Sequence, residues 1–150
     1  MKTVSKGKNH KAINIGAIDS LSDYSFVHPK LGHTVENKLF IGELLEATGS
    51  EISFMELPAR TTINFLHKHK KHEEIYIFLK GNGQYQVDSE VFSIEEGSIV
   101  RVSPEGSRVL SNTSDEKMIY LVVQSVAESL AGYNIADGFR VQGEIKMKQE

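Results

Sequence analysis

Short runs of apolar and β-favouring residues, each closed by turn residues, recur through the middle of the chain. The runs rich in Ile, Val, Phe and Tyr lie at residues 52–55, 61–66, 75–79, 84–87, 91–94, 99–102, 109–110 and 118–123. Clusters of Gly, Pro, Asn, Asp and Ser separate them, as is typical of tight turns. Strands this short, with turns roughly every 8–12 residues, predict an all-β sandwich or barrel with little helix.

The segments outside this region are less regular. Residues 38–46, KLFIGELLE, fit a strand or an amphipathic helix, and we favour a strand. Residues 19–29 and 126–131 each predict at most one short helical turn, and residues 139–141 are a strand candidate near the C-terminus.

The run at residues 74–79 is apolar on both faces of a strand, and so is the run at 118–123. Successive side chains alternate across a strand, so Ile75, Ile77 and Leu79 point outward when their neighbours point into a barrel. A strip of apolar side chains on the outer face is expected to be buried against another surface. We therefore favour a homodimer, the alternative being a two-layer sandwich that covers itself.

Composition narrows the class of protein. A length of 150 residues fits one domain spanning residues 1–150, and the absence of Cys excludes disulfides, thiolate catalysis and Cys-ligated metal. The net charge of −3 argues against nucleic acid as a partner. Residues 1–18 carry several lysines and no long apolar run, so we expect a polar N-terminal arm rather than a secretory signal. With no apolar stretch of membrane-spanning length, we expect a soluble, cytoplasmic protein without a membrane partner.

The polar cluster at residues 66–83, LHKHKKHEEIYIFLKGNG, precedes a predicted strand and is followed by an expected hairpin turn at 81–83. His67 and His69 are separated by one residue, so on an extended chain both imidazoles lie on one face and the lysines lie on the other. Glu73 and Glu74 have opposite parity, and only Glu74 shares the inward face. The remaining histidine of the cluster, His72, has the wrong parity and is assigned to a loop.

Two imidazoles and one carboxylate suit a divalent ion such as Fe, Mn, Ni or Zn, with open positions for water or substrate. His67, His69 and Glu74 are therefore the predicted metal ligands. The alternative is an exposed basic loop whose histidines are solvated. Parity also makes Tyr76, Phe78 and Gln84 candidate ligand-binding residues.

The segment from His67 to Gly81 resembles the first motif of the cupins, H-x-H, four residues, E, six residues and G. Residues 97–112, GSIVRVSPEGSRVLSN, resemble the second motif, with Gly97 and Asn112 in register. The two motifs lie in a core region at residues 61–123. The resemblance implies a double-stranded β-helix, which is a jelly-roll barrel.

The second motif departs from the cupin pattern at Arg108, which occupies the position of a histidine that is usually a fourth metal ligand. A guanidinium has no lone pair to offer a metal ion. In one interpretation, three residues hold the ion and Arg108 pairs with an anionic ligand. In the other, no metal is kept and Arg108 pairs with Glu74.

Three functions remain open at this point. The first is a cupin that binds a divalent metal and an anionic small molecule, without an assigned reaction. The second is a metal-dependent enzyme, either an Fe(II) dioxygenase or an isomerase. The third is a metal-free carbohydrate isomerase or epimerase with His67 or His69 as general base. The catalytic residues themselves cannot be assigned from the sequence.

Overall fold

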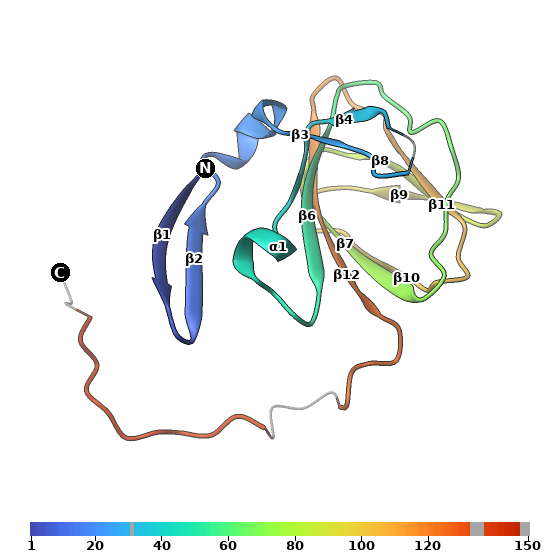
Figure 1. Ribbon diagram of the computed structural model, residues 1–150. Helices are drawn as coiled ribbons and strands as arrows, with labels where there is room; N and C mark the ends of the chain where they lie inside the picture. The colour runs from blue at the N-terminus through green and yellow to red at the C-terminus, as the bar shows by residue number, and fades with distance from the viewer. Residues whose placement is uncertain (31, 133–136, 148–150) are drawn as a thin grey trace.

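The computed structural model describes residues 1–30, 32–132 and 137–147 (Figure 1). Its strands are β1 (Lys2–Gly7), β2 (His10–Asn14), β3 (Ser25–Val27), β4 (Thr34–Glu36), β5 (Lys38–Phe40), β6 (Glu51–Leu57), β7 (His72–Lys80), β8 (Gly83–Val87), β9 (Glu90–Ile94), β10 (Ile99–Val102), β11 (Arg108–Asn112) and β12 (Met118–Val126). The helical elements are the 3-10 helix η1 (Ile18–Asp23) and the short helix α1 (Gly42–Leu45). The predicted all-β architecture with little helix is confirmed.

Two antiparallel sheets enclose the core. One has the order β10-β7-β12-β6-β5, and the other has the order β11-β8-β9. The chain changes sheet between β7 and β8, between β9 and β10, between β10 and β11, and between β11 and β12. The two sheets form the rounded body in Figure 1, and the β1–β2 hairpin lies beside it.

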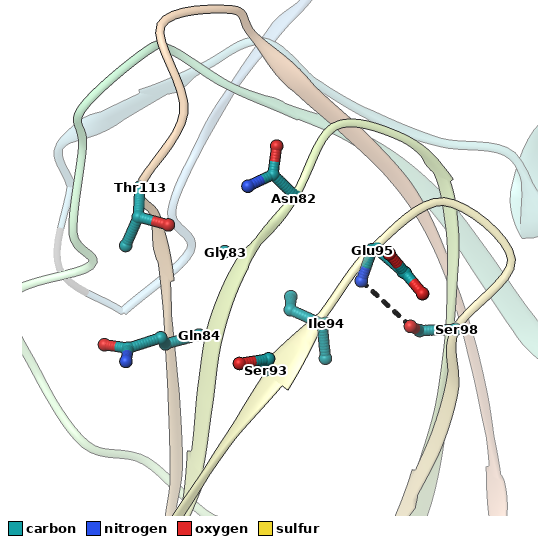
Figure 2. Close-up of a pocket in the computed structure, with 8 residues that line it drawn as sticks. All are labelled: Asn82, Gly83, Gln84, Ser93, Ile94, Glu95, Ser98 and Thr113. Carbon is teal, nitrogen blue, oxygen red and sulfur yellow. Dashed lines mark hydrogen bonds between the residues drawn. The ribbon is translucent and has the colours of Figure 1, made fainter.

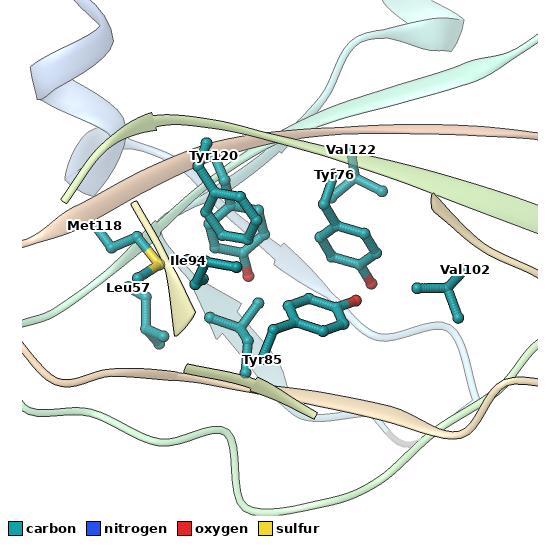
Figure 3. Close-up of a cluster of buried hydrophobic side chains, with 10 residues drawn as sticks. Leu57, Tyr76, Tyr85, Ile94, Val102, Met118, Tyr120 and Val122 are labelled. Atoms are coloured by element: carbon teal, nitrogen blue, oxygen red, sulfur yellow. The ribbon is translucent and has the colours of Figure 1, made fainter. Parts of the chain in front are cut away.

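The alternation predicted for β7 is confirmed. Glu74, Tyr76 and Phe78 are buried, while Ile75 and Ile77 are half-buried on the opposite face. The buried apolar side chains that form the core between the sheets are Leu57, Tyr76, Phe78, Tyr85, Ile94, Val102, Leu110, Met118, Tyr120 and Val122 (Figure 3). Some aromatic rings of this core meet edge to face, an arrangement that the quadrupoles of the rings favour. Tyr76 and Tyr85, for example, have ring centroids 5.2 Å apart.

The turn at residues 81–83 is not the hairpin that the sequence predicted. β8 pairs with β9 and β11 rather than with β7, so this turn carries the chain from one sheet to the other. Gly81 adopts a φ of +89°, and a Cβ there would lie 3.0 Å from the Cα of Met118. A side chain at this position is therefore disfavoured by both conformation and space.

Residues 61–66 do not form the predicted strand. The segment runs beside β11 but joins it only through isolated bridges, Thr62 with Ser111 and His67 with Arg108. His72, which was assigned to a loop, is instead the first residue of β7. Both errors arise because strand ends depend on where a distant partner lies.

Four segments outside residues 52–123 also differ from or refine the predictions. The strand favoured over residues 38–46 is only β5, followed by α1. Within residues 1–18, β1 and β2 form a hairpin, and Lys6 and Lys11 each place Nζ 2.7 Å from Oε1 of Glu46 beside α1. Residues 139–141 are not a strand, and residues 126–131 contain no helical turn.

Apolar side chains remain exposed on the outer surface, including Ile99 of β10, which is 67% exposed. The homodimer expected from the outward apolar strips stays a prediction. Among the described residues, no helix is long and apolar enough to cross a membrane.

Candidate metal centre and ligand cavity

A cavity of about 910 Å³ opens between the two sheets. Side chains of β5, β6, β7 and β12 form one wall, β8 and β11 contribute the other, and residues 61–67 with the β3–β4 hairpin lie at its rim. Its volume lies within the range of roughly 300–1,000 Å³ that is usual for small-molecule sites. His28 and His33 also contribute to the lining.

The three predicted metal ligands meet in this cavity. Nε2 of His69 lies 3.0 Å from Oε1 of Glu74, and Nε2 of His67 lies 3.9 Å from Oε2 of the same carboxylate. One ligand atom from each residue can be chosen so that all lie within 4.8 Å of one another. His67 is held by backbone hydrogen bonds with Arg108 on β11, and Glu74 is fixed by β7.

The two oxygens of Glu74 have different environments. Oε2 accepts hydrogen bonds from the Arg108 guanidinium and, at 2.7 Å, from the hydroxyl of Tyr76. Burial raises the pKa of this carboxyl, but the hydrogen bonds from Arg108 and Tyr76 outweigh burial and hold the pKa below its usual value. Glu74 is therefore a carboxylate whose Oε1 faces His69 and stays available to a cation.

The imidazoles also have nitrogen atoms to offer. Nδ1 of His67 and Nε2 of His69 are buried and make no hydrogen bond. Nδ1 of His69 lies 3.0 Å from the side-chain amide of Gln124, a contact that orients the ring from behind. Burial, the largest cause, lowers the pKa of His69. Two neutral imidazoles and a carboxylate, each with one ligand atom within 4.8 Å of the others, fit a divalent ion.

Arg108 does not bind the metal ion itself but holds the Glu74 carboxylate in place. Its side chain is 1% exposed, and besides Glu74 it donates from Nη1 to the carbonyl oxygen of Gly106 at 3.0 Å. The pairing of Arg108 with Glu74 is the one that the metal-free interpretation predicted. Because it occupies Oε2 alone, the same contact also suits a metal bound at Oε1.

Comparison with known proteins agrees with this arrangement. The family model described as the cupin domain matches residues 53–124, which include both sequence motifs and all three candidate ligands. Residues 53–124 of the chain form a cupin domain.

Solved cupin structures share the fold along most of the chain. A cupin protein from Bacteroides fragilis is 29% identical, with a TM-score of 0.72 over 91% of this chain and 100% of that one. A Cupin 2 conserved barrel domain protein from Salinispora arenicola is 18% identical, with a TM-score of 0.58 over 77% of this chain and 91% of that one. The double-stranded β-helix implied by the sequence motifs is thereby confirmed.

Sequence similarity to a curated relative extends over a shorter segment of the chain. An uncharacterized protein from Methanocaldococcus jannaschii is 36% identical over 47 residues, which cover 31% of this chain. The matched part spans 38% of the length of that relative.

The cupin cavity includes only some of the other predicted ligand-binding residues. Tyr76 lines it, whereas Phe78 is buried in the core and is not part of the lining. Gln84 is exposed on the outer side of β8 and borders a separate depression beside Asn82 and Thr113 (Figure 2). The inward residue of β8 is its neighbour Tyr85, one position away from the predicted register.

Sequence reasoning missed further residues of the cavity, among them Lys38 on β5, Gln124 on β12 and Tyr85. Alternation within β8 and β12 could have indicated Tyr85 and Gln124, had the strand starts been known. Lys38 lay in a segment whose strand or helix assignment was ambiguous.

The pH dependence of stability follows from His67. Burial, reinforced by repulsion from Arg108, lowers its pKa to about 4. The unfolded chain has the ordinary histidine pKa of about 6.5, so between these values the unfolded state binds more protons. The stability contributed by neutral His67 is therefore complete above about pH 6.5 and is lost as the pH falls towards about 4.

We expect the urea midpoint of chelator-treated protein to fall between about pH 7 and about pH 5, and to fall less in His67→Gln. The exposed His10 provides the control, because His10→Gln should leave the pH dependence unchanged. Equal slopes in wild type and His67→Gln would contradict the assignment.

Proposed function

We propose that this cupin binds one divalent metal ion through His67, His69 and Oε1 of Glu74, and that the bound ion helps to hold an anionic small molecule in the cavity. The observation that carries the proposal is that one nitrogen of each imidazole and a carboxylate oxygen of Glu74 lie within 4.8 Å of one another, with Nε2 of His69 only 3.0 Å from Oε1. Fe, Mn, Ni and Zn are the candidate ions. When bound, such an ion would supply a positive charge and open coordination positions.

The charges of the cavity support an anionic ligand. Lys38 and Arg108 balance Glu51 and Glu74, so the fixed charges on its walls sum to zero when the histidines are neutral. A divalent ion would then leave a net charge of +2 in a largely apolar space. Such a charge is costly to bury without a counter-charge, which an anionic ligand provides.

The enzymatic alternatives use the same site. An Fe(II) dioxygenase or a metal-dependent isomerase would need the same three ligands, so the metal site itself does not separate binding from turnover. A metal-free carbohydrate isomerase is less well supported. Phe26, Phe40, Met55, Leu57 and Ile63 line the cavity, and these side chains offer no hydrogen bonds to sugar hydroxyls.

The test is metal titration by isothermal calorimetry, with Mn²⁺ and Zn²⁺ added to chelator-treated protein near pH 7.5. Wild type should bind one ion per chain, and Glu74→Gln should bind roughly 100-fold more weakly or not at all. Glu73→Gln is the matched control, because Glu73 is next in sequence but pairs with Arg101 on the outer face.

Two results would contradict the proposal. One is wild-type protein that binds neither ion, and the other is equal affinity in Glu74→Gln and Glu73→Gln. Circular dichroism of both variants establishes that the barrel is folded before the affinities are compared.

A further inference from the structure

The cavity contains one cation that the metal site does not use. Lys38 belongs to β5, where it lies opposite Met55 of β6, and both side chains line the cavity. Its ammonium lies 4.8 Å from the centre of the Phe40 ring. No carboxylate among the described residues forms an ion pair with it.

The other charged groups of the cavity already have partners. Arg108 pairs with Glu74, and Oε1 of Glu51 accepts hydrogen bonds from the backbone N–H groups of Gly42 and Ile52. Burial lowers the pKa of Lys38, and Glu74 only partly offsets this effect. An ammonium placed in this way lacks a counter-charge, and an anion in the cavity would supply one.

Lys38 also lines the same cavity as the three residues of the candidate metal centre. The charge of Glu74 partly offsets the lowering of the Lys38 pKa, and the charge of Lys38 contributes to the lowered pKa of His67. A carboxylate group between them would meet two positive partners, the metal ion and the ammonium, at neighbouring points.

A cluster of apolar side chains forms part of the cavity wall. Phe26 of β3 and Phe40 of β5 meet edge to face with centroids 4.9 Å apart, and Met55, Leu57 and Ile63 continue the lining. Such a cluster favours contact with a hydrocarbon or aromatic body.

We propose that Lys38 is the anion-anchoring residue of the cavity and that the natural ligand is a carboxylate with an apolar body. The carboxylate lies between Lys38 and the His67–His69–Glu74 centre, and the body packs against the two phenylalanines. This assignment rests on the proposed function for its metal partner, but the contact with Lys38 does not require the ion.

The test uses trans-cinnamate as probe and its neutral analogue trans-cinnamamide. Dissociation constants are measured by calorimetry for wild type, Lys38→Met and Lys38→Arg, each loaded with Mn²⁺ and each treated with EDTA. Lys8→Met is the matched control, because Lys8 is exposed at the turn of the β1–β2 hairpin. Glycerol phosphate serves as an anion with a polar body.

Wild type should prefer cinnamate to cinnamamide by about 10-fold or more, as expected for one charge-assisted hydrogen bond. Lys38→Met should lose most of that preference, and Lys38→Arg and Lys8→Met should retain it. The effect of Lys38 should persist after EDTA treatment, with weaker binding overall.

The inference is overturned by any of four results: an unchanged preference in Lys38→Met, equal binding of the two probes by wild type, no binding of cinnamate, or tighter binding of glycerol phosphate. If Mn²⁺ fails to bind while the Lys38-dependent preference survives in EDTA, the metal proposal falls and this one stands. If Mn²⁺ binds but the preference for cinnamate over cinnamamide is absent, the metal proposal stands and the proposal for Lys38 falls.

Discussion

Replacing Arg108 with methionine is expected to lower the free energy of unfolding by about 3–5 kcal/mol. Arg108 is 1% exposed and Glu74 is 7% exposed, so the ion pair has little contact with solvent. Methionine fills part of the space but leaves the Glu74 carboxylate buried with Tyr76 as its remaining hydrogen-bond donor. Removing one partner of a buried pair is costly because the other charge stays behind. Urea unfolding of chelator-treated protein near pH 7.5 measures the loss.

Two further variants separate burial of the charge from a general packing defect. Arg108→Met combined with Glu74→Met removes both charges and should recover most of the lost stability. Arg101→Met breaks an exposed pair with Glu73 and should cost less than about 1 kcal/mol. A double variant as unstable as Arg108→Met would show that the guanidinium acts through its packing.

Replacing Asn112 with alanine is expected to cost about 3 kcal/mol. Its side chain is 1% exposed, and Nδ2 donates to the carbonyl oxygens of Leu57, Pro58 and Glu116 at 3.0, 3.0 and 2.7 Å. Oδ1 accepts from the backbone N–H and the hydroxyl of Ser114. One amide thus joins the end of β6 to the loop before β12, and alanine would leave several of these groups without partners.

The control for this variant is Asn82→Ala. Asn82 is exposed in the turn before β8, so its loss should change the free energy of unfolding by no more than about 0.5 kcal/mol. Urea midpoints of both variants, compared at equal m-value, check the prediction. A loss below about 1 kcal/mol in Asn112→Ala would mean that water replaces the side-chain amide.

Local patterns predicted what depends on local geometry. The alternation of β7 placed Glu74 and Tyr76 on the inner face, and the single residue between His67 and His69 placed both imidazoles together. These features survive because side-chain parity is a property of any extended chain. The metal cluster is therefore readable even though its two histidines lie in a segment outside the named strands.

Features that depend on distant partners were not predictable in the same way. Gln84 was assigned inward because the start of β8 was unknown, and a shift of one residue exchanges the two faces of a strand. The apolar segment at residues 61–66 has strand-like residues, yet its neighbour β11 pairs with it only at isolated positions. Lys38 enters the cavity only because β5 joins the edge of the sheet next to β6.

The two carboxylate oxygens of Glu74 have different partners, and this difference makes folding independent of metal binding. Arg108 and Tyr76 satisfy Oε2 without an ion, so the barrel does not depend on metal to neutralise this buried carboxylate. Small zinc domains behave differently, because they unfold when the metal is removed. A metal ion could therefore bind at Oε1 and dissociate while the barrel stays folded. The identity of the bound ion would then depend on which ions are available to the folded protein.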